Sequence, residues 1–530
     1  MAQNAQKDLL AHGAHGSVAD TIDERFSQEL IFALVGPVGS GVSTTATYLN
    51  ELLTLDFGYA VAPIIKMSDI IRDEAHRVGV TAPPRKPIGQ YIDVMQTAGN
   101  KLREKLGNNY LTEKAIEKIV TFRTASGGYA GSGIPLPGRR AYIIDSLKNI
   151  DEFLLLRQIY GDTLCLVGVF APDLMRTQRL KDDSAIEAKD ADLQKIMARD
   201  HGEIATFGQM TRRTFVESDF FVCNDRKRDE LRAQLSRYLQ LIFDTAIHTP
   251  TTAESAMYKA DSVASNSACM SRQVGAAIVS ATGELISVGC NDVPKFGGGL
   301  YTEDDQNSWD DKEKKLLDKD NRCFKWGGNI CHNELRRNTI LTNIAKKIAG
   351  SDLVKRGANY TDIRALLAGT EVDSLTEFSR SIHAEMEAIL AVAREGRHSL
   401  VGATLYTSTY PCHSCARHIV ASGIKSVIYI QPYAKSLATV LHSDSVTEDL
   451  ADRTRVVFRQ YEGVAPRNFL KLFRPTAPRK KDGYFSRVGA KIATPIFRIP
   501  LDSPVDYEAK VIAELERKEQ DSESASGARG

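Results

Sequence analysis

The sequence lacks an excess of charge of either sign, is poor in cysteine and tryptophan, and has no apolar run long enough to cross a membrane. Its 68 Lys and Arg residues nearly balance its 67 Asp and Glu residues, so no polybasic field indicates nucleic acid or a membrane as partner. Eight cysteines in 530 residues are too few for a disulfide-stabilised scaffold, and their concentration late in the chain favours metal chemistry. The polar first 20 residues contain no signal-peptide core. We therefore expect a cytoplasmic protein with no membrane span.

The rhythm of apolar residues predicts two α/β domains. From residue 28 to 248, short apolar runs alternate with helical, charge-rich stretches, a pattern typical of a parallel sheet covered by helices. The apolar runs are Glu29–Val35, Tyr59–Ile65, Ala141–Ile144, Leu164–Phe170 and Phe220–Cys223. The segment Thr249–Thr252 breaks this pattern and marks the boundary to a second domain, residues 253–475.

The second domain begins with a predicted helix, Ala253–Ser265, and a β-hairpin formed by Val274–Val279 and Leu285–Val288. A polar insertion fills residues 293–375. At the ends of the chain, we expect a flexible segment over residues 1–27 and a partly disordered tail over 476–530.

The strongest functional signal is His383-Ala384-Glu385, followed by Pro411-Cys412-His413-Ser414-Cys415. Zinc takes thiolate and imidazole ligands, and a catalytic site keeps one position open for water, so we predict that His383, Cys412 and Cys415 bind catalytic Zn²⁺. Glu385 is predicted to lie beside the metal and to move a proton from water to the leaving group. A structural zinc knuckle is the alternative, but it would use a fourth protein ligand and would not need Glu385.

Residues 253–435 resemble the cytidine and deoxycytidylate deaminase superfamily through these motifs, Arg272–Val279 and the turn Gly289–Pro294. The resemblance implies a cytidine-deaminase-like α/β/α domain with a mixed five-stranded sheet. It also implies hydrolysis at C4 of cytosine to give uracil and ammonia, with Asn291 at the substrate sugar. An Asn291 that only closes a turn is the alternative. The resemblance also implies that the protein forms a homo-oligomer, for which a hexamer is one candidate.

The segments Gln431–Ala438, His442–Ser445 and Phe458–Arg467 are similar to those of bacterial anti-phage dCTP/dCMP deaminases, in which a P-loop domain precedes the deaminase. That resemblance implies that the protein depletes dCTP during infection. It also suggests an RNA antitoxin that inhibits the protein, although no residues in the sequence support this partner. Lys435 and Arg467 become candidates for the substrate phosphate, because a nucleotide needs cations there. Solvated surface charges are an equal alternative, and the choice between dCTP and dCMP stays open.

A glycine-rich loop follows the first apolar run and precedes a predicted helix, an arrangement that binds phosphate through backbone N–H groups. Its candidate binding residues are Gly36, Gly39, Ser40, Gly41, Val42, Ser43 and Thr44. Val42 stands where a Walker A motif has its lysine, so we expect nucleotide binding and regulation rather than kinase chemistry. Asp145, after Ala141–Ile144, is predicted to hold Mg²⁺. A plain turn between strand and helix is the alternative.

Cys323, Cys331 and His332 lie in the polar insertion, and Cys290 precedes it. These four residues are candidates for a second, structural Zn²⁺, with reduced and unliganded thiols as the competing interpretation.

The leading hypothesis is a zinc-dependent deaminase that converts deoxycytidine nucleotides to deoxyuridine nucleotides. A nucleic-acid cytidine deaminase is the second hypothesis, but it needs a basic channel with aromatic residues, which a net charge of +1 and two tryptophans do not favour. The third hypothesis is a nucleotide-sensing scaffold without catalysis. The complete His383, Glu385, Cys412 and Cys415 set argues against it.

Overall fold

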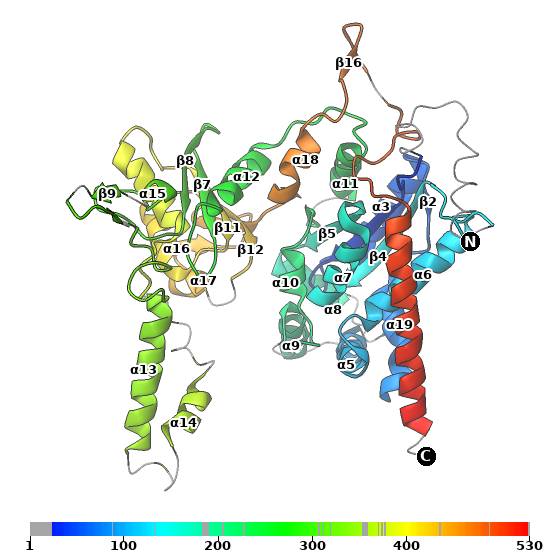
Figure 1. The fold of residues 1–530 in the computed structure, drawn as a ribbon, viewed down its shortest axis with the longest axis horizontal. Helices are drawn as coiled ribbons and strands as arrows, with labels where there is room; N and C mark the ends of the chain where they lie inside the picture. Colours follow the sequence, from blue (N-terminus) through cyan, green and yellow to red (C-terminus); the bar gives the residue numbers. More distant parts are fainter. Residues whose placement is uncertain are drawn as a thin grey trace. The chain divides into compact units, whose positions relative to one another are not determined.

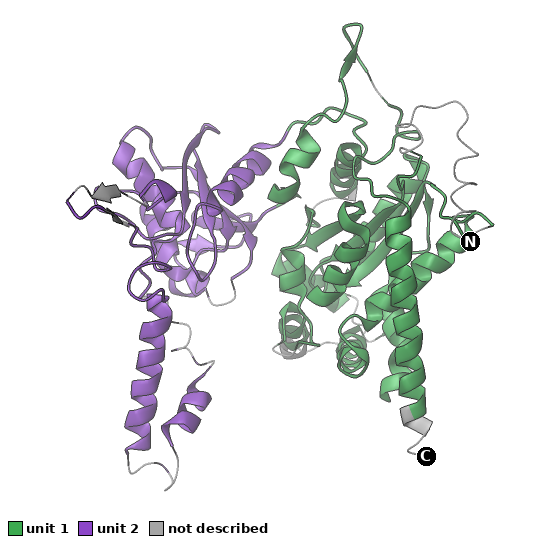
Figure 2. Cartoon of the chain, viewed as in Figure 1, with its two compact units in different colours: residues 1–249, 462–530 green, residues 250–461 purple. Residues whose placement is uncertain are grey.

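The computed structural model of the chain describes residues 24–527, except 87, 132, 183–189, 204–205, 226–227, 306–307, 311, 318–319, 352–353, 355–358, 369, 371, 373–374, 376–377, 434–435 and 487. The chain folds into two compact units, coloured separately in Figure 2. The first unit comprises residues 1–249 and 462–530, and the second comprises residues 250–461. Both units are α/β, as the sequence predicts. Within the described residues, no helix combines the length and apolar character needed to cross a membrane.

The first unit is built on a sheet that has seven strands among the described residues, in the order β15-β6-β5-β1-β4-β2, with β3 also paired to β4. The strands are β1 (Leu30–Val35), β2 (Ala60–Val61), β3 (Ile65–Lys66), β4 (Arg140–Leu147), β5 (Leu164–Phe170), β6 (Phe220–Cys223) and β15 (Gly463–Val464). Every residue of β1, β5 and β6 is buried. These continuous apolar runs therefore form the centre of a largely parallel sheet, where both faces are covered.

Helices cover the faces of this sheet, as Figure 1 shows. They are α3 (Val42–Leu55), α4 (Met67–Glu74), α5 (Ile88–Leu106), α6 (Tyr110–Ala125), α7 (Ile150–Tyr160), α8 (Asp173–Asp182), α9 (Asp190–His201), α10 (Thr211–Phe215), α11 (Arg228–Ile242), α18 (Phe469–Phe473) and α19 (Asp502–Gly527). Gly41 precedes α3 with φ +85°, a left-handed conformation that favours glycine and turns the chain sharply from loop to helix. The loop after β1 therefore ends at a helix N-terminus.

The last part of the chain differs from the tail predicted over residues 476–530. Residues 462–475 belong to the first unit, where β15 pairs antiparallel with β6, and α19 packs against α6 and α7. At the other end, the predicted flexible segment 1–27 lies mostly outside the described residues, while Phe26 pairs with Pro500 in an isolated bridge. Because the sequence of α19 is mostly polar, it does not indicate which residues of this helix pack against the rest of the first unit.

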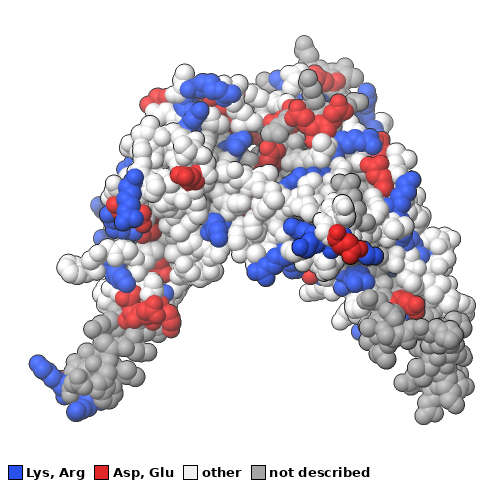
Figure 3. All heavy atoms as spheres, turned by 90° about the horizontal axis from the view of Figure 1, so that it is seen from above, with Lys and Arg blue, Asp and Glu red and all other residues white. Residues whose placement is uncertain are grey.

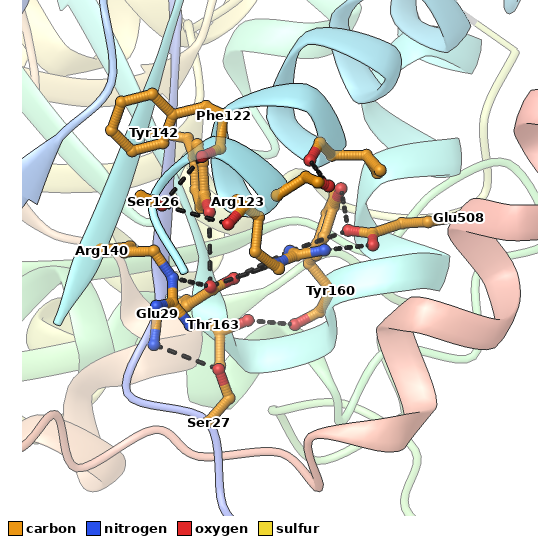
Figure 4. Close-up of polar contacts among 12 residues, drawn as sticks. Ser27, Glu29, Phe122, Arg123, Ser126, Arg140, Tyr142, Tyr160, Thr163 and Glu508 are labelled. Atoms are coloured by element: carbon orange, nitrogen blue, oxygen red, sulfur yellow. Dashed lines mark hydrogen bonds and ion pairs between the residues drawn. The ribbon is translucent and has the colours of Figure 1, made fainter. Parts of the chain in front are cut away.

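A buried ion cluster holds α19 in place (Figure 4). The Arg123 guanidinium donates to Glu29 Oε2 at 2.8 Å and to Glu508 Oε1 at 3.0 Å. Arg140 also donates to Glu29, and the Tyr160 hydroxyl donates to Glu508 at 2.8 Å. Arg123 is 3% exposed and Glu508 1% exposed, so each charge depends on its partners for stabilisation.

The second unit contains a mixed sheet with six strands among the described residues, in the order β13-β14-β12-β11-β7-β8. Its strands are β7 (Gly275–Val279), β8 (Leu285–Cys290), β11 (Thr404–Thr409), β12 (Ser426–Gln431), β13 (Val446–Thr447) and β14 (Val456–Gln460), and a separate ribbon is formed by β9 (Ser308–Asp310) and β10 (Lys315–Leu317). The two-residue strand β13 makes this sheet one strand larger than the predicted five. The predicted hairpin is confirmed as β7 and β8.

Helices of the second unit include two that come from the predicted polar insertion. They are α12 (Thr252–Ala264), α13 (His332–Ala349), α14 (Tyr360–Leu367), α15 (Ala384–Glu395), α16 (His413–Ala421) and α17 (Ala438–Leu441). In Figure 1, α13 and α14 lie side by side and project away from the sheet of this unit. In the first unit, two further strands of two residues each, β16 (Lys480–Lys481) and β17 (Tyr484–Phe485), pair antiparallel to form a short hairpin.

Replacing Glu508 with alanine should lower the free energy of unfolding by about 3 kcal/mol, because the change leaves Arg123 buried with one carboxylate fewer. Urea denaturation followed by circular dichroism measures the change. Glu516→Ala, at an exposed position on the same helix, is the matched control and should cost less than about 0.5 kcal/mol. Equal effects of the two substitutions would contradict a role of the ion cluster in docking α19.

Candidate active site

The hairpin β7–β8 and helix α15 place the histidine and glutamate of the first motif. His383 is the N-cap residue of α15, and Glu385 lies in its first turn. The helix packs directly on β8, since a Cβ atom at Gly289 would lie 2.5 Å from the backbone nitrogen of Ala388. The segment before the helix is anchored as well, because the Ile382 N–H donates to the Asp292 carbonyl at 2.9 Å. The start of α15 is thereby fixed beside the end of β8.

The cysteine motif occupies the start of a second helix. Strand β11 leads through Tyr410 and Pro411 to Cys412, which is the N-cap residue of α16. The Cys412 sulfur accepts the backbone N–H of Cys415 at 3.4 Å. One helical turn therefore brings both sulfurs to the same end of α16, where the positive end of the helix dipole favours thiolate.

The two helix starts bring His383, Cys412 and Cys415 together. His383 Nδ1 lies 3.4 Å from Cys412 Sγ and 3.3 Å from Cys415 Sγ. Among the described residues, this trio is the group whose three ligating atoms lie within 4.8 Å of one another. A tetrahedral ion about 2.0 Å from nitrogen and about 2.3 Å from sulfur requires a nitrogen–sulfur separation of roughly 3.5 Å. The donor set and its spacing fit Zn²⁺ with one position left open.

The surroundings of the trio shift the pKa values of two groups in opposite directions. Hydrogen bonds from the Cys415 thiol and from His383 lower the pKa of Cys412 to about 3, despite its burial. Burial raises the pKa of Glu385, which is 4% exposed. Cys412 is therefore prepared as a thiolate ligand, whereas the buried Glu385 binds a proton more readily than an exposed glutamate does.

A cavity of about 480 Å³ is lined by His383 and Cys412 of this trio and by Glu385. Asn291 lines the cavity, and its amide is engaged with the backbone: it accepts the Val274 N–H at 2.7 Å and donates to the Arg272 carbonyl at 2.9 Å. The structure thus gives Asn291 the turn-closing role that the sequence left as an alternative, while its position on the cavity wall is compatible with the substrate role.

Three arginines that were not predicted as phosphate-binding residues also line the cavity: Arg272, Arg380 and Arg337, of which Arg337 pairs with Glu334. Arg272 lies over the Tyr433 ring at 5.4 Å, and Arg380 lies over the Trp326 ring at 4.0 Å. Arg380 stands three residues before His383, and Arg272 opens the segment that carries the family resemblance. Cationic side chains near these two motifs are the signal in the sequence that could have identified them.

Of the two predicted phosphate-binding cations, the structure describes one. Lys435 lies outside the described residues. Arg467 belongs to the first unit, where its guanidinium pairs with Asp219 at 3.1 Å and Glu217 at 3.0 Å. The role of both residues at the substrate phosphate stays a prediction.

The predicted second metal cluster is only partly assembled. Cys323, Cys331 and His332 line the same cavity as the trio, together with Cys269. Cys290 is separate from them: it lines another cavity with Glu387, and burial, with the charges of Asp292 and Glu387, raises its pKa to about 11. Cys290 thus lines a different cavity from the other three candidates, and Cys269 lines theirs.

In the first unit, the glycine-rich loop lies between β1 and α3, as predicted. Gly39 and Gly41 have φ values of +81° and +85°, and Ser43 Oγ donates to Asp145 Oδ2 at 2.7 Å. Gly36, Gly39, Gly41, Val42, Ser43 and Thr44 line a second cavity, whereas the Ser40 side chain is fully buried beneath the loop. The hydroxyl and the carboxylate that would hold Mg²⁺ are thus brought together from the first turn of α3 and from β4.

Comparison with known proteins places the second unit among deaminases. The family described as the cytidine and deoxycytidylate deaminase zinc-binding region matches residues 250–431. The deoxycytidylate deaminase of Enterobacteria phage T4 is 31% identical over 176 residues, which cover 33% of this chain and 75% of the phage protein. The deoxycytidylate deaminase of phage T2 is 42% identical over 78 residues, covering 14% of this chain and 41% of that protein.

Among solved structures, the dCMP deaminase of cyanophage S-TIM5 is similar to this chain with a TM-score of 0.22 and 17% identity. The match covers 40% of this chain and 100% of the cyanophage chain.

Replacing Cys412 or Cys415 with serine should reduce bound zinc from about one ion per chain to a small fraction, because each removes one of three protein ligands. Inductively coupled plasma mass spectrometry on purified protein measures the zinc content. Glu385→Gln is the matched control, since this residue is buried next to the ligands without being one of them, and zinc should stay. Full zinc content in both serine variants would contradict the assignment of the ligands.

Proposed function

The chain belongs to the cytidine and deoxycytidylate deaminase family, and on that premise we propose that its second unit hydrolyses deoxycytidine nucleotides to deoxyuridine nucleotides and ammonia. The observation that carries this proposal is the convergence of His383, Cys412 and Cys415 beside the buried carboxyl group of Glu385. A structural zinc site does not need a group that transfers protons. Hydrolytic deamination does, because protons must move from water to the ring and to the leaving amino group.

The chain's own residues account for the proton transfers of this reaction. His383, Cys412 and Cys415 would hold Zn²⁺, which when bound supplies the Lewis acidity that makes water a nucleophile at neutral pH. Glu385 accepts a proton from the attacking water and delivers it to N3 of the cytosine ring. It then carries the second proton to the departing amino group, so that water and cytosine become uracil and ammonia. The raised pKa of Glu385 suits both directions of transfer.

The cations on the cavity wall support a phosphorylated substrate. We propose Arg272 and Arg380, in addition to Lys435 and Arg467, as groups that bind the substrate phosphate. A cavity of about 480 Å³ has the size of a small-ligand site. On the face drawn in Figure 3, positive and negative side chains are interspersed, which supports a free nucleotide better than a polyanion as substrate.

We also propose the finer parts of the function that the resemblance implies. These are conversion of dCTP as well as dCMP, depletion of the dCTP pool in defence against phage, assembly into a homo-oligomer and control through the first unit. The loop with Ser43 and Asp145 supports the last of these, as a site for a nucleotide with Mg²⁺. A second, structural Zn²⁺ on Cys290, Cys323, Cys331 and His332 also stays a proposal. Among the described residues, no three of the atoms that would bind it lie within 4.8 Å of one another.

Purified protein should convert dCTP or dCMP to the deoxyuridine nucleotide, and Glu385→Gln should reduce the rate by roughly 10²–10⁴-fold, because it removes the proton carrier. Chromatography of the products, with cytidine, CTP and single-stranded DNA as parallel substrates, measures the conversion. Arg417→Gln, at an exposed position of α16, is the control and should keep wild-type activity. Conversion of DNA without conversion of mononucleotides would refute the proposal, as would full activity of Glu385→Gln.

A further inference from the structure

A second cavity, of about 820 Å³, lies over the glycine-rich loop of the first unit. One end of this cavity is formed by Gly36–Thr44 and therefore by the N-terminus of α3, which has 14 residues. The lining also includes an apolar set of residues from α4 and α5. This set consists of Met67, Ile71, Ile88, Tyr91, Ile92 and Met95. The site therefore combines an anion-binding end with an apolar compartment.

A lysine from the neighbouring strand supplies the cation that Val42 does not. Val35 in β1 is paired in register with Leu147 in β4, so the next residues along the two strands, Gly36 and Lys148, are neighbours. Lys148 Nζ donates to the Gly36 carbonyl at 2.7 Å and to Asp200 Oδ1 at 2.8 Å. It thus stands at the loop with two of its three N–H bonds engaged, and it lines the cavity.

A carboxylate already occupies part of the loop. Asp200 is fully buried, and its Oδ2 accepts the Val38 N–H at 2.8 Å. This negative charge opposes the entry of a chain of several phosphates, which the missing Walker lysine would also fail to neutralise. A ligand with a single phosphate group fits the loop better than a triphosphate.

The apolar compartment contains an unsatisfied amide. Gln96 on α5 is 6% exposed and lines the cavity, and among the described residues neither its Oε1 nor its Nε2 has a hydrogen-bond partner. Gln209, 3% exposed on the same cavity, likewise leaves its Oε1 unpaired. Buried polar atoms are almost always hydrogen-bonded, so these atoms point to a ligand that presents a donor and an acceptor side by side.

We propose that this cavity binds a nucleoside 5′-monophosphate, with the phosphate on the loop N–H groups and Lys148 and the base against Tyr91 and Met95, where its edge pairs with Gln96. A nucleobase edge carries the adjacent donor and acceptor that a glutamine amide matches. Inorganic phosphate would leave the amide unpaired, and an apolar ligand would leave the loop empty. The proposal names the ligand for the control through the first unit that is part of the proposed function, and its physiological meaning rests on that control.

Binding is measured in full-length protein carrying Glu385→Gln, so that a failure of the deaminase proposal does not affect the result. Isothermal titration calorimetry with AMP, GMP and dTMP should find one of them bound at a site sensitive to Gln96→Leu, which weakens binding about tenfold or more. Lys148→Met should weaken the nucleotide and inorganic phosphate alike, whereas Gln96→Leu should leave phosphate unchanged. Gln520→Leu, exposed on α19, is the matched control and should change neither.

The melting temperature of the ligand-free protein separates a binding role from a structural one. Gln96→Leu removes a buried, unpaired amide from an apolar wall, so we expect it to leave the melting temperature unchanged or to raise it. A lower melting temperature together with unchanged nucleotide binding would overturn the assignment of Gln96 to the base. Binding of triphosphates alone, of phosphate alone, or of no mononucleotide would overturn the proposal as a whole.

Discussion

The structure of the second unit depends on holding one imidazole and two sulfur atoms within about one hydrogen-bond length of each other at the meeting point of two helix N-termini. His383 precedes α15 and Cys412 precedes α16, so both helices direct their N–H groups and partial positive charge toward the same small volume. The close approach of α15 to β8 at Gly289 fixes one helix, and the pairing of β11 with β12 fixes the strand that leads to the other. Glu385 is buried as a consequence of this packing, and its burial makes the carboxyl group a proton carrier.

The first unit applies the same physical principle to a different ligand. Its glycine-rich loop also ends at a helix N-terminus, but oxygen and nitrogen groups take the place of sulfur. In place of the Walker lysine, the loop has Lys148, which the parallel register of β1 and β4 brings beside Gly36. Each unit thus brings a helix N-terminus into a cavity lined by cationic side chains, which is a suitable arrangement for anionic nucleotides.

Much of this arrangement could be predicted from the sequence where the signal is local. Leu164–Phe170 and Phe220–Cys223 are strands over the predicted bounds. Continuous apolar runs between charged helices are typical of parallel strands that are buried on both faces. The run Tyr59–Ile65 instead divides into β2 and β3, since Pro63 in its middle has no N–H to donate. Helix α19 was not predicted because its docking depends on pairs that lie far apart in sequence, such as Glu508 with Arg123, 385 residues away, and Lys518 with Glu113.

The candidate sites follow the same division. The metal trio and Glu385 were predictable from two short motifs, and the loop glycines from one. That Arg467 belongs to the first unit could not be predicted, because a sequence pattern does not show at which residue the chain returns to that unit. Lys148 was missed because its role arises from strand register, and Arg272 and Arg380 because cations on a cavity wall are recognised only once the cavity exists.

The central claim is that three protein ligands hold a catalytic zinc ion and leave its fourth position to water. Zinc K-edge X-ray absorption of the purified full-length protein tests it most directly. The account predicts two sulfur neighbours at about 2.3 Å and two nitrogen or oxygen neighbours at about 2.0 Å, one of them lost or replaced when substrate or product is added. A shell of four protein ligands that is insensitive to nucleotide, or protein without zinc that still deaminates, would contradict it.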